Sequence, residues 1–311
     1  MQTLKFKGMY KSYKLSLVSL FLILFSGFFS VVFPQAHYEG LIRIENPSET
    51  VYVSKGHEEF GKHLAGLVEG ANRYLSALVG KPVPQTTLLI LSREDWGKFT
   101  NPQIIYGMPH YGGNTLVVAA EDNDFWRANM PPLHTLTPEQ QEVFRQVYAN
   151  EAGELSVRPF FDVLAIHELG HGWTTYHTIK RQRFWLEEIF CNVFLHTFIA
   201  EKRPDLLPAL EVLPMLQTTG NRNQFKYTTL TQFEEGYWII ARDAPVNYGW
   251  YQFRFHYAAK EVYDMAGPQV LKNLWNFMAG QSDILDQEAL LNGLHSNVHP
   301  AMADVYRRWD E

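Results

Sequence analysis

The stretch PFFDVLAIHELGHGWTTYH, from Pro159 to His177, is the segment on which the predicted fold depends most. A proline opens it, and the apolar run after the proline predicts a buried helix. Inside this helix, HELGH at 167–171 places two histidines four residues apart. Four residues make about one helical turn, so His167 and His171 point the same way and can hold one metal ion.

Glu168 lies between these histidines in sequence, about 100° from one and about 60° from the other around the helix. It therefore borders the metal without having to bind it. There it can act as a general base toward a water molecule that a zinc ion activates. Two buried histidines and a carboxylate would be costly without a metal, so we expect one Zn²⁺ per chain rather than a purely structural cluster.

A hydrolytic zinc site needs a third protein ligand, and two residues compete for this place. The segment WLEEIFC at 185–191 offers Glu188 on a second predicted helix. This segment resembles the WLNEGFA segment of aminopeptidase-N-like gluzincins, zinc peptidases in which a glutamate completes the metal site. The resemblance implies that Glu188 is the third ligand, with Cys191 at the family's alanine position. Glu187 points about 100° away, and we expect it to be solvated.

The rival third ligand is His177. HELGHGWTTYH puts this histidine where metzincin endopeptidases, with the pattern HExxHxxGxxH, have their third one. Thr174 replaces the glycine at which that family turns sharply, and a β-branched residue suits a left-handed turn poorly. Glu188 is therefore preferred, and a metzincin-like endopeptidase with His177 remains the alternative.

Other residues gain roles only through the gluzincin resemblance. Asn192 comes one turn after Glu188, where thermolysin-like members carry an aspartate that orients a zinc-binding histidine; an ordinary polar helix contact is the alternative. The segment 248–275 is similar to the family's later helix pair, in which a tyrosine donates to the oxyanion. The resemblance implies Tyr248 as that catalytic donor, with Tyr251 as its alternate. Tyr257 also lies at a spacing that matches the family's pattern. Aromatic residues at this spacing are more often part of the core.

Periodicity along the rest of the chain predicts an α+β protein. Residues 57–79 have helical spacing and end at Gly80, residues 86–91 and 115–120 are β-rich, and helices dominate from Pro138 onward. We expect a small mixed-sheet α/β lobe over 37–155 and a mainly helical lobe over 156–311, together one catalytic unit of zincin-like fold. Thr115–Ala120 resembles the family's edge strand, along which an extended peptide lies.

The N-terminal residues differ from the rest in charge and hydropathy. The first 36 contain four lysines and no acidic residue, and the 19 residues Leu15–Phe33 carry no charge. This pattern predicts that 1–36 is a signal sequence or membrane anchor, with membrane attachment through 15–33 and export of residues 37–311. The rest of the chain holds 23 basic against 33 acidic side chains. Nucleic acid is therefore excluded as an expected partner.

The expected function is zinc-dependent hydrolysis of peptide bonds in a peptide or protein substrate, by an exported or membrane-anchored gluzincin-type metallopeptidase. The GxMEN segment, with which the aminopeptidases bind a free amine, has no counterpart in YGGNTLVVAAEDN at 111–123. The resemblance therefore does not imply exopeptidase activity, the removal of terminal residues from a peptide. Besides the metzincin-like enzyme, a catalytically inactive binding domain that kept the zincin fold is a further alternative. The single cysteine excludes an internal disulfide framework.

Overall fold

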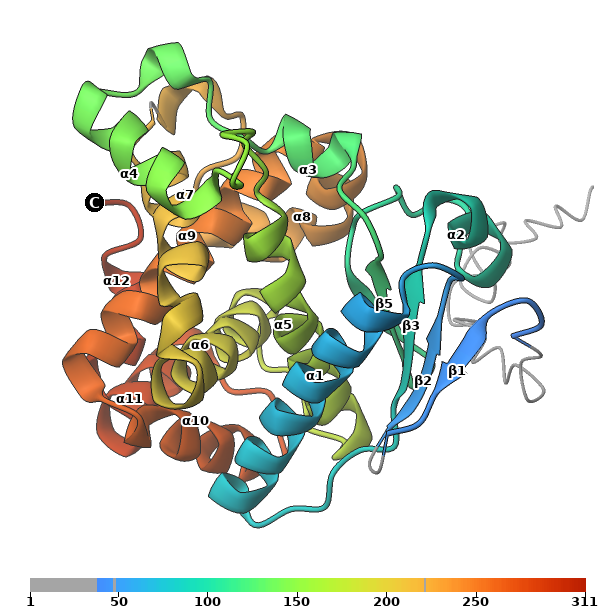
Figure 1. The fold of residues 1–311 in the computed structure, drawn as a ribbon. Coiled ribbons are helices and arrows are strands. Elements are labelled where there is room, and N and C mark those ends of the chain that lie inside the picture. Colours follow the sequence, from blue (N-terminus) through green and yellow to red (C-terminus); the bar gives the residue numbers. More distant parts are fainter. Residues whose placement is uncertain (1–37, 47–48, 221) are drawn as a thin grey trace, which may run out of the picture. The chain divides into compact units, whose positions relative to one another are not determined.

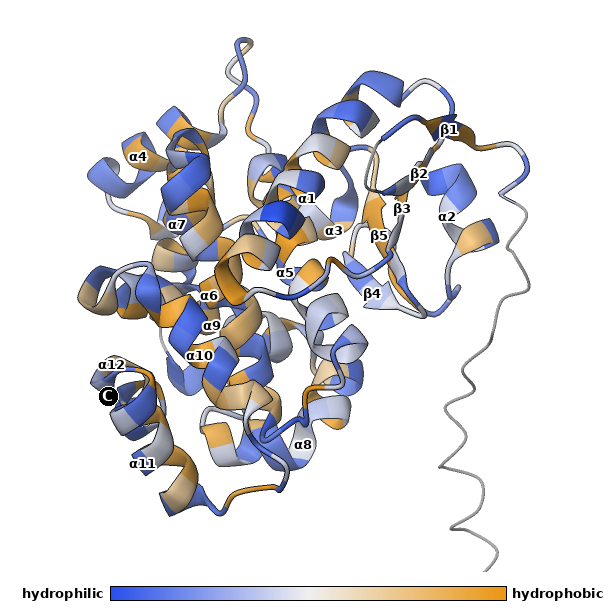
Figure 2. Ribbon diagram, turned by 90° about the horizontal axis from the view of Figure 1, so that it is seen from below, coloured by the Kyte–Doolittle hydropathy of each residue, from blue (hydrophilic) through white to orange (hydrophobic). Residues whose placement is uncertain are grey.

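Five strands form one mixed sheet in the computed structural model, which describes residues 38–46, 49–220 and 222–311. The strand order is β1-β2-β3-β5-β4 (Figure 1). Strands β2 (Thr50–Val53), β3 (Thr87–Leu91) and β5 (Thr115–Ala119) run parallel to each other. Strands β1 (Ile42–Ile44) and β4 (His110–Gly112) add antiparallel at the two edges. Four consecutive residues of β3 and of β5 are buried, as parallel strands covered on both faces require, and Figure 2 shows hydrophobic residues along both.

The expectation that Thr115–Ala120 forms the edge strand is wrong. The chain makes a tight hairpin at Gly113 and Asn114, whose φ angles are 56° and 63°. Two left-handed residues in sequence are what a two-residue hairpin with the favoured twist requires. The hairpin lays β4 outside β5, so the edge of the sheet is the three-residue strand His110–Gly112.

Helix α1 (Glu58–Val79) matches the predicted helix and ends at Gly80, whose φ of 67° stops it in a left-handed cap. It contacts β1 and β2 on one side and α5 (Arg158–Tyr176) on the other, and so joins the sheet to the helical part. The described helices after it make the protein α+β, as predicted. They are α2 (Arg93–Phe99), α3 (Asp124–Ala128), α4 (Pro138–Tyr148), α5, α6 (Phe184–Lys202), α7 (Leu207–Thr218), α8 (Leu230–Asp243), α9 (Pro245–Ala266), α10 (Gln269–Ala279), α11 (Gln287–Asn297) and α12 (Pro300–Arg307).

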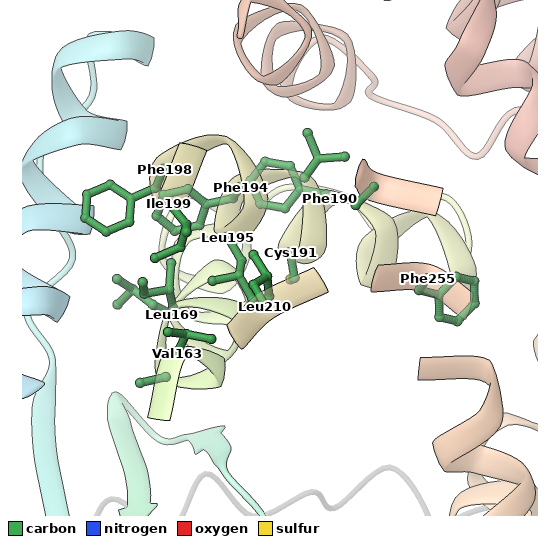
Figure 3. Close-up of a cluster of buried hydrophobic side chains, with 14 of the residues drawn as sticks. Val163, Leu169, Phe190, Cys191, Phe194, Leu195, Phe198, Ile199, Leu210 and Phe255 are labelled. Atoms are coloured by element: carbon green, nitrogen blue, oxygen red, sulfur yellow. The ribbon is translucent and has the colours of Figure 1, made fainter. Parts of the chain in front are cut away.

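Helix α6 lies in the middle of the helical part. Every residue from Trp185 to Ile199 is buried, because α5, α7, α8, α9 and α10 surround this helix. A helix that is apolar on all sides is expected in such a place. Figure 3 shows its phenylalanines packed among side chains of neighbouring helices, including Leu169 of α5 and Leu210 of α7.

Two glycines of HELGHG allow unusually close packing around α5. A Cβ on Gly170 would lie 2.8 Å from Cys191 Sγ and 3.1 Å from Cys191 Cα, so α5 and α6 touch at this point. A Cβ on Gly172 would lie 2.6 Å from the ring of Tyr111, which β4 lays against α5. The motif is thereby fixed between α6 and the edge strand.

Residues Tyr38–Glu311 form one compact unit. The segment expected to be a signal or anchor, residues 1–36, lies outside the described residues. Among the described residues, no helix is both long and apolar enough to span a membrane.

Candidate functional site

The two histidines of HELGH point toward the same carboxylate oxygen. Glu188 Oε2 lies 3.3 Å from His167 Nε2 and 3.9 Å from His171 Nε2. Donor atoms about 2.0–2.2 Å from a tetrahedral zinc ion lie about 3.3–3.6 Å apart. The first distance falls in this range and the second is slightly above it. The spacing predicted from sequence therefore does bring His167, His171 and Glu188 together.

Glu188 presents one oxygen to the histidines. Its Oε1 accepts a hydrogen bond from the hydroxyl of Tyr237 at 2.8 Å, whereas its buried Oε2 faces the two histidine rings and lies 3.3 Å from His167 Nε2. Burial opposes its ionisation, but the two histidines and Tyr237 outweigh this and lower the pKa of Glu188 below its usual value. A buried, anionic carboxylate oxygen beside two imidazoles is a donor set that fits a zinc ion.

The remaining ring nitrogens are held by side chains of α6. His167 Nδ1 lies 3.0 Å from Asn192 Oδ1, and His171 Nδ1 lies 3.5 Å from Glu187 Oε1. Contacts of this kind fix the ring orientation of a metal ligand and leave its other nitrogen free. Of the two alternatives for Asn192, the structure places it against the first histidine of the motif.

The expectation of a solvated Glu187 is wrong, because only 8% of its surface is exposed. Its carboxylate accepts hydrogen bonds from Thr174 Oγ1 at 3.0 Å and from Arg181 Nε. Burial opposes its charge, but His171 and Arg181 lower the pKa of Glu187 to about 2. Arg181 lies in the turn between α5 and α6. The positive partner of Glu187 therefore depends on the path of that turn, and the periodicity of α6 alone cannot predict it.

Cys191 offers a second donor set that sequence reasoning did not consider. One donor atom from each of His167, His171 and Cys191 lies within 4.8 Å of the other two. The thiol is fully buried beside His171, and burial raises its pKa to about 12. It must lose a proton to bind a metal strongly, whereas Glu188 is already ionised.

Glu168 lies on the open side of the histidines. It lines a cleft of about 450 Å³, which also touches β4, α8 and α9. Burial raises the pKa of Glu168 above its usual value, while both histidines and a backbone hydrogen bond from Tyr111 of β4 favour the carboxylate. A raised pKa makes the Glu168 carboxylate a stronger base than a solvent-exposed glutamate.

The wall of the cleft beyond the motif is largely apolar. Its apolar members come from the segment before β4, from α3, from the first turns of α5 and α6, and from α8 and α9. They are Met108, Pro109, Phe125, Phe160, Phe161, Leu164, Phe184, Trp238, Pro245 and Phe253. The charged side chains of the lining, Glu168, Glu187 and Arg181, gather at the motif. An apolar cleft with a few convergent polar groups is typical of a ligand-binding site.

The predicted tyrosines lie in different places. Tyr248 lines the cleft, and its hydroxyl lies 3.3 Å from that of Tyr237. Tyr251 is fully buried outside the cleft, where its hydroxyl donates to Thr229 O at 2.8 Å and its ring stacks on Trp309. Tyr257, 37% exposed, does not line the cleft either. Sequence reasoning missed Tyr237, since no motif surrounds it.

His177 lies apart from the two histidines of the motif. It caps α5, which runs on to Tyr176 without the turn that a metzincin site needs. Its Nε2 lies 3.0 Å from Pro82 O, and its ring packs against Trp173 and Trp275. It is absent from the cleft lining.

Comparison of the chain with protein-family models, with curated proteins and with solved structures finds no match in any of the three. The roles of these residues therefore follow from their geometry and from the sequence motifs alone.

Proposed function

We propose that this chain is a zinc-dependent metallopeptidase of the gluzincin type with a zincin-like fold, which hydrolyses peptide bonds of a peptide or protein substrate. The observation that carries the proposal is the approach of two histidine Nε2 atoms to Glu188 Oε2, at 3.3 and 3.9 Å, beside a cleft that Glu168 and both histidines line. His167, His171 and Glu188 would hold the ion. When bound, zinc polarises the scissile carbonyl and makes water more acidic.

The chain's own residues account for the proton transfers. Glu168 takes a proton from the attacking water and passes it to the leaving amine, because its carboxylate lies on the cleft side of the histidines. Tyr248 donates its hydroxyl to the oxyanion that forms on the substrate, since Tyr237 uses its own hydroxyl hydrogen on Glu188. Tyr251 has no part in this mechanism, because its hydroxyl is engaged outside the cleft.

The proposal includes export from the cytoplasm. It is supported by the four lysines in residues 1–14 and by the uncharged run of residues 15–33 that follows them. Cell fractionation of the tagged full chain tests it. We expect the protein in the membrane or extracytoplasmic fraction, and recovery of full-length protein only from the cytoplasm would contradict export.

The first experiment measures zinc per chain by elemental mass spectrometry in the full-length protein after metal-replete purification. We expect one zinc in the wild type and in His177→Ala, and a loss in Glu188→Ala. Loss with His177→Ala alone would favour the metzincin-like alternative. Loading with Co²⁺ then separates the two donor sets, because a thiolate ligand adds an intense sulfur-to-metal charge-transfer band. We expect no such band; a band that disappears in Cys191→Ser would move the ligand from Glu188 to the thiol.

The second experiment tests hydrolysis with casein and a broad peptide library. We expect Glu168→Gln to keep its zinc and to lose hydrolysis by about 10²–10⁴-fold, the usual contribution of general-base catalysis. Full activity of that variant would refute the mechanism. If the zinc-loaded wild type cleaves none of these substrates, the result would favour the alternative of a catalytically inactive binding domain.

A further inference from the structure

The turn between α5 and α6 ends in polar side chains, residues 180–183, and three of them bind the same segment of main chain. That segment, residues 282–285, lies between α10 and α11. The bonds run from Lys180 Nζ to Ser282 O at 2.8 Å, from Gln182 Nε2 to Asp283 O at 2.9 Å and from Arg183 Nη2 to Leu285 O at 2.9 Å. Among the described residues, Arg181 donates to none of that segment, and it lines the cleft instead.

Two contacts hold the guanidinium of Arg181 at the cleft. Its Nε donates to Glu187 Oε2, and its Cζ lies over the ring of Phe184, 4.8 Å from the ring centroid. Phe184 is in turn stacked on Tyr237, with ring centroids 4.3 Å apart. All of these residues line the same cleft. A planar guanidinium held in this way loses less conformational entropy when it binds a ligand than a freely rotating side chain does.

The outer edge of this guanidinium has no acceptor in the described part of the chain. A guanidinium has N–H donors on Nε, Nη1 and Nη2, and here the described residues accept only from Nε. The side chain of Arg181 is 49% exposed, so the donors on Nη1 and Nη2 can be reached from the cleft. An arginine that served Glu187 alone would bind more strongly through two parallel bonds, whereas this arginine leaves the fork of Nη1 and Nη2 open.

The chemistry of this fork favours a carboxylate as its ligand. Two parallel N–H donors match the two oxygens of a carboxylate in geometry and in charge. Arg181 is the sole lysine or arginine among the described residues that line this cleft. Because most of the wall is apolar, a carboxylate that enters the cleft needs a positive partner to offset the loss of its hydration. A peptide supplies such a group at its C-terminus or on an aspartate or glutamate side chain.

Glu187 sets the place of this ligand relative to the proposed zinc site. Its Oε1 lies 3.5 Å from His171 Nδ1, and its Oε2 accepts from Arg181. A single carboxylate group therefore separates the guanidinium from a side chain that would hold the ion. An extended chain advances about 3.3 Å per residue, so a substrate carboxylate on Arg181 belongs to a residue only a few positions from the scissile bond.

We propose that Arg181 is a specificity-determining residue of this cleft, which binds a carboxylate of the peptide substrate through Nη1 and Nη2. This inference rests on the proposed function, and it names the substrate class: peptides that carry a carboxylate within a few residues of the cleaved bond. If that carboxylate is the C-terminus, the enzyme removes short C-terminal pieces. If it is an acidic side chain, the enzyme cleaves within the chain close to that residue.

The test measures the binding of library peptides to the zinc-loaded full-length Glu168→Gln protein by fluorescence anisotropy, with an uncharged BODIPY dye at the N-terminus of each peptide. The peptide that binds most tightly is made again in two forms, one amidated at its C-terminus and one with asparagine and glutamine in place of every aspartate and glutamate. We expect one form to bind about ten- to a hundredfold more weakly, the loss of a charge-assisted hydrogen bond. The form that loses affinity identifies the source of the carboxylate. Equal affinities of all three peptides, or no binding by any library peptide, would overturn the proposal.

Arg181→Gln, introduced into the same zinc-loaded protein, removes the fork. We expect this variant to bind the parent peptide and its weakened form equally well. A purely structural role of Arg181 would weaken the binding of both peptides and keep their ratio. An unchanged ratio in Arg181→Gln would therefore overturn the proposal, since zinc or another group would then hold the carboxylate. If Arg181→Gln fails to fold, Arg181→Lys keeps the positive charge beside Glu187 but lacks the fork, and it should reduce the ratio.

Arg183→Gln is the matched control, because it removes the same charge from the same turn. Both Nη atoms of Arg183 donate to main-chain carbonyls, those of Gln182 and Leu285, and Arg183 does not line the cleft. This variant should keep the ratio of the two affinities that the protein with Arg181 and Arg183 shows. Loss of the ratio in both variants would assign the preference to the net charge of the turn and overturn the role of Arg181.

The outcomes distinguish this inference from the proposed function. A carboxylate preference that depends on Arg181, in a protein whose wild type cleaves nothing, would refute the peptidase and keep the binding site. Cleavage of casein by a protein in which Arg181→Gln leaves the ratio of affinities unchanged would keep the peptidase and refute the role of Arg181.

Discussion

Replacing Gly170 by alanine tests whether close contact between α5 and α6 holds the site together. Alanine favours a helix over glycine by about 1 kcal/mol, which by itself would stabilise α5. The added Cβ, however, would lie 2.8 Å from Cys191 Sγ and 3.1 Å from both Cys191 Cα and Cys191 Cβ. The Cα belongs to the backbone of a fully surrounded helix and cannot move aside cheaply. Overpacking of this kind costs about 1–3 kcal/mol, so after the gain in helix propensity we expect a net loss of stability of up to about 2 kcal/mol.

The matched control is Gly66→Ala in α1, an exposed helical position where a new Cβ meets nothing within 4 Å. It should stabilise the protein by about 0.5–1 kcal/mol. Urea unfolding of the zinc-free proteins compares the two substitutions, with the slope against urea checked for constancy. If Gly170→Ala proved as stable as Gly66→Ala, the close approach of the helices would be refuted. Zinc affinity should also fall in Gly170→Ala alone, since a wedge at this point moves Glu188 away from the histidines.

Three further predictions concern buried polar groups. Burial raises the pKa of Glu49 from 4.5 to about 7, so the folded state holds its proton more tightly than the unfolded state does. The free energy of unfolding should therefore fall as the pH rises from about 4.5 to 7, and urea titrations at both ends should show a loss about 2 kcal/mol larger in wild type than in Glu49→Gln. Glu187→Gln should weaken zinc binding about tenfold or more in competition with a chelator, because His171 loses its charged partner; unchanged affinity would remove Glu187 from the site. Tyr237→Phe should weaken zinc binding in the same assay, because Glu188 Oε1 loses its hydrogen bond. The melting temperature of the zinc-free protein should stay close to that of wild type, since the ring can still stack on Phe184.

The parts of the site that sequence predicted are those set by spacing within one helix. His167 and His171 face the same way because four residues make a turn, and Glu188 reaches them because α6 comes after α5 with only a short turn between them. The fold class was also predicted from periodicity, since the long helix before Gly80 and the apolar strands leave a clear pattern.

The parts that sequence did not predict depend on contacts between distant segments. Tyr237 meets Glu188 across 49 positions, and no pattern around that tyrosine marks it. The burial of Glu187 depends on Arg181 folding back from the interhelical turn. Strand β4 was missed because three residues containing a glycine give no alternation, and its place at the edge is decided by pairing with β5.

The proposed metal site and the cleft differ in how far apart their parts lie along the chain. His167, His171, Glu187, Glu188 and Asn192 all belong to one helical hairpin, Arg158 to Lys202, whereas the opposite wall of the cleft comes from α9, which begins at Pro245. Contacts that close short loops form earlier and at lower entropic cost than those that close long ones. During folding, the hairpin can therefore bring the proposed metal ligands together before α9 has docked. If the proposed ligands do bind zinc, a chain captured at that stage would hold the ion but would lack the wall of the cleft that α9 provides.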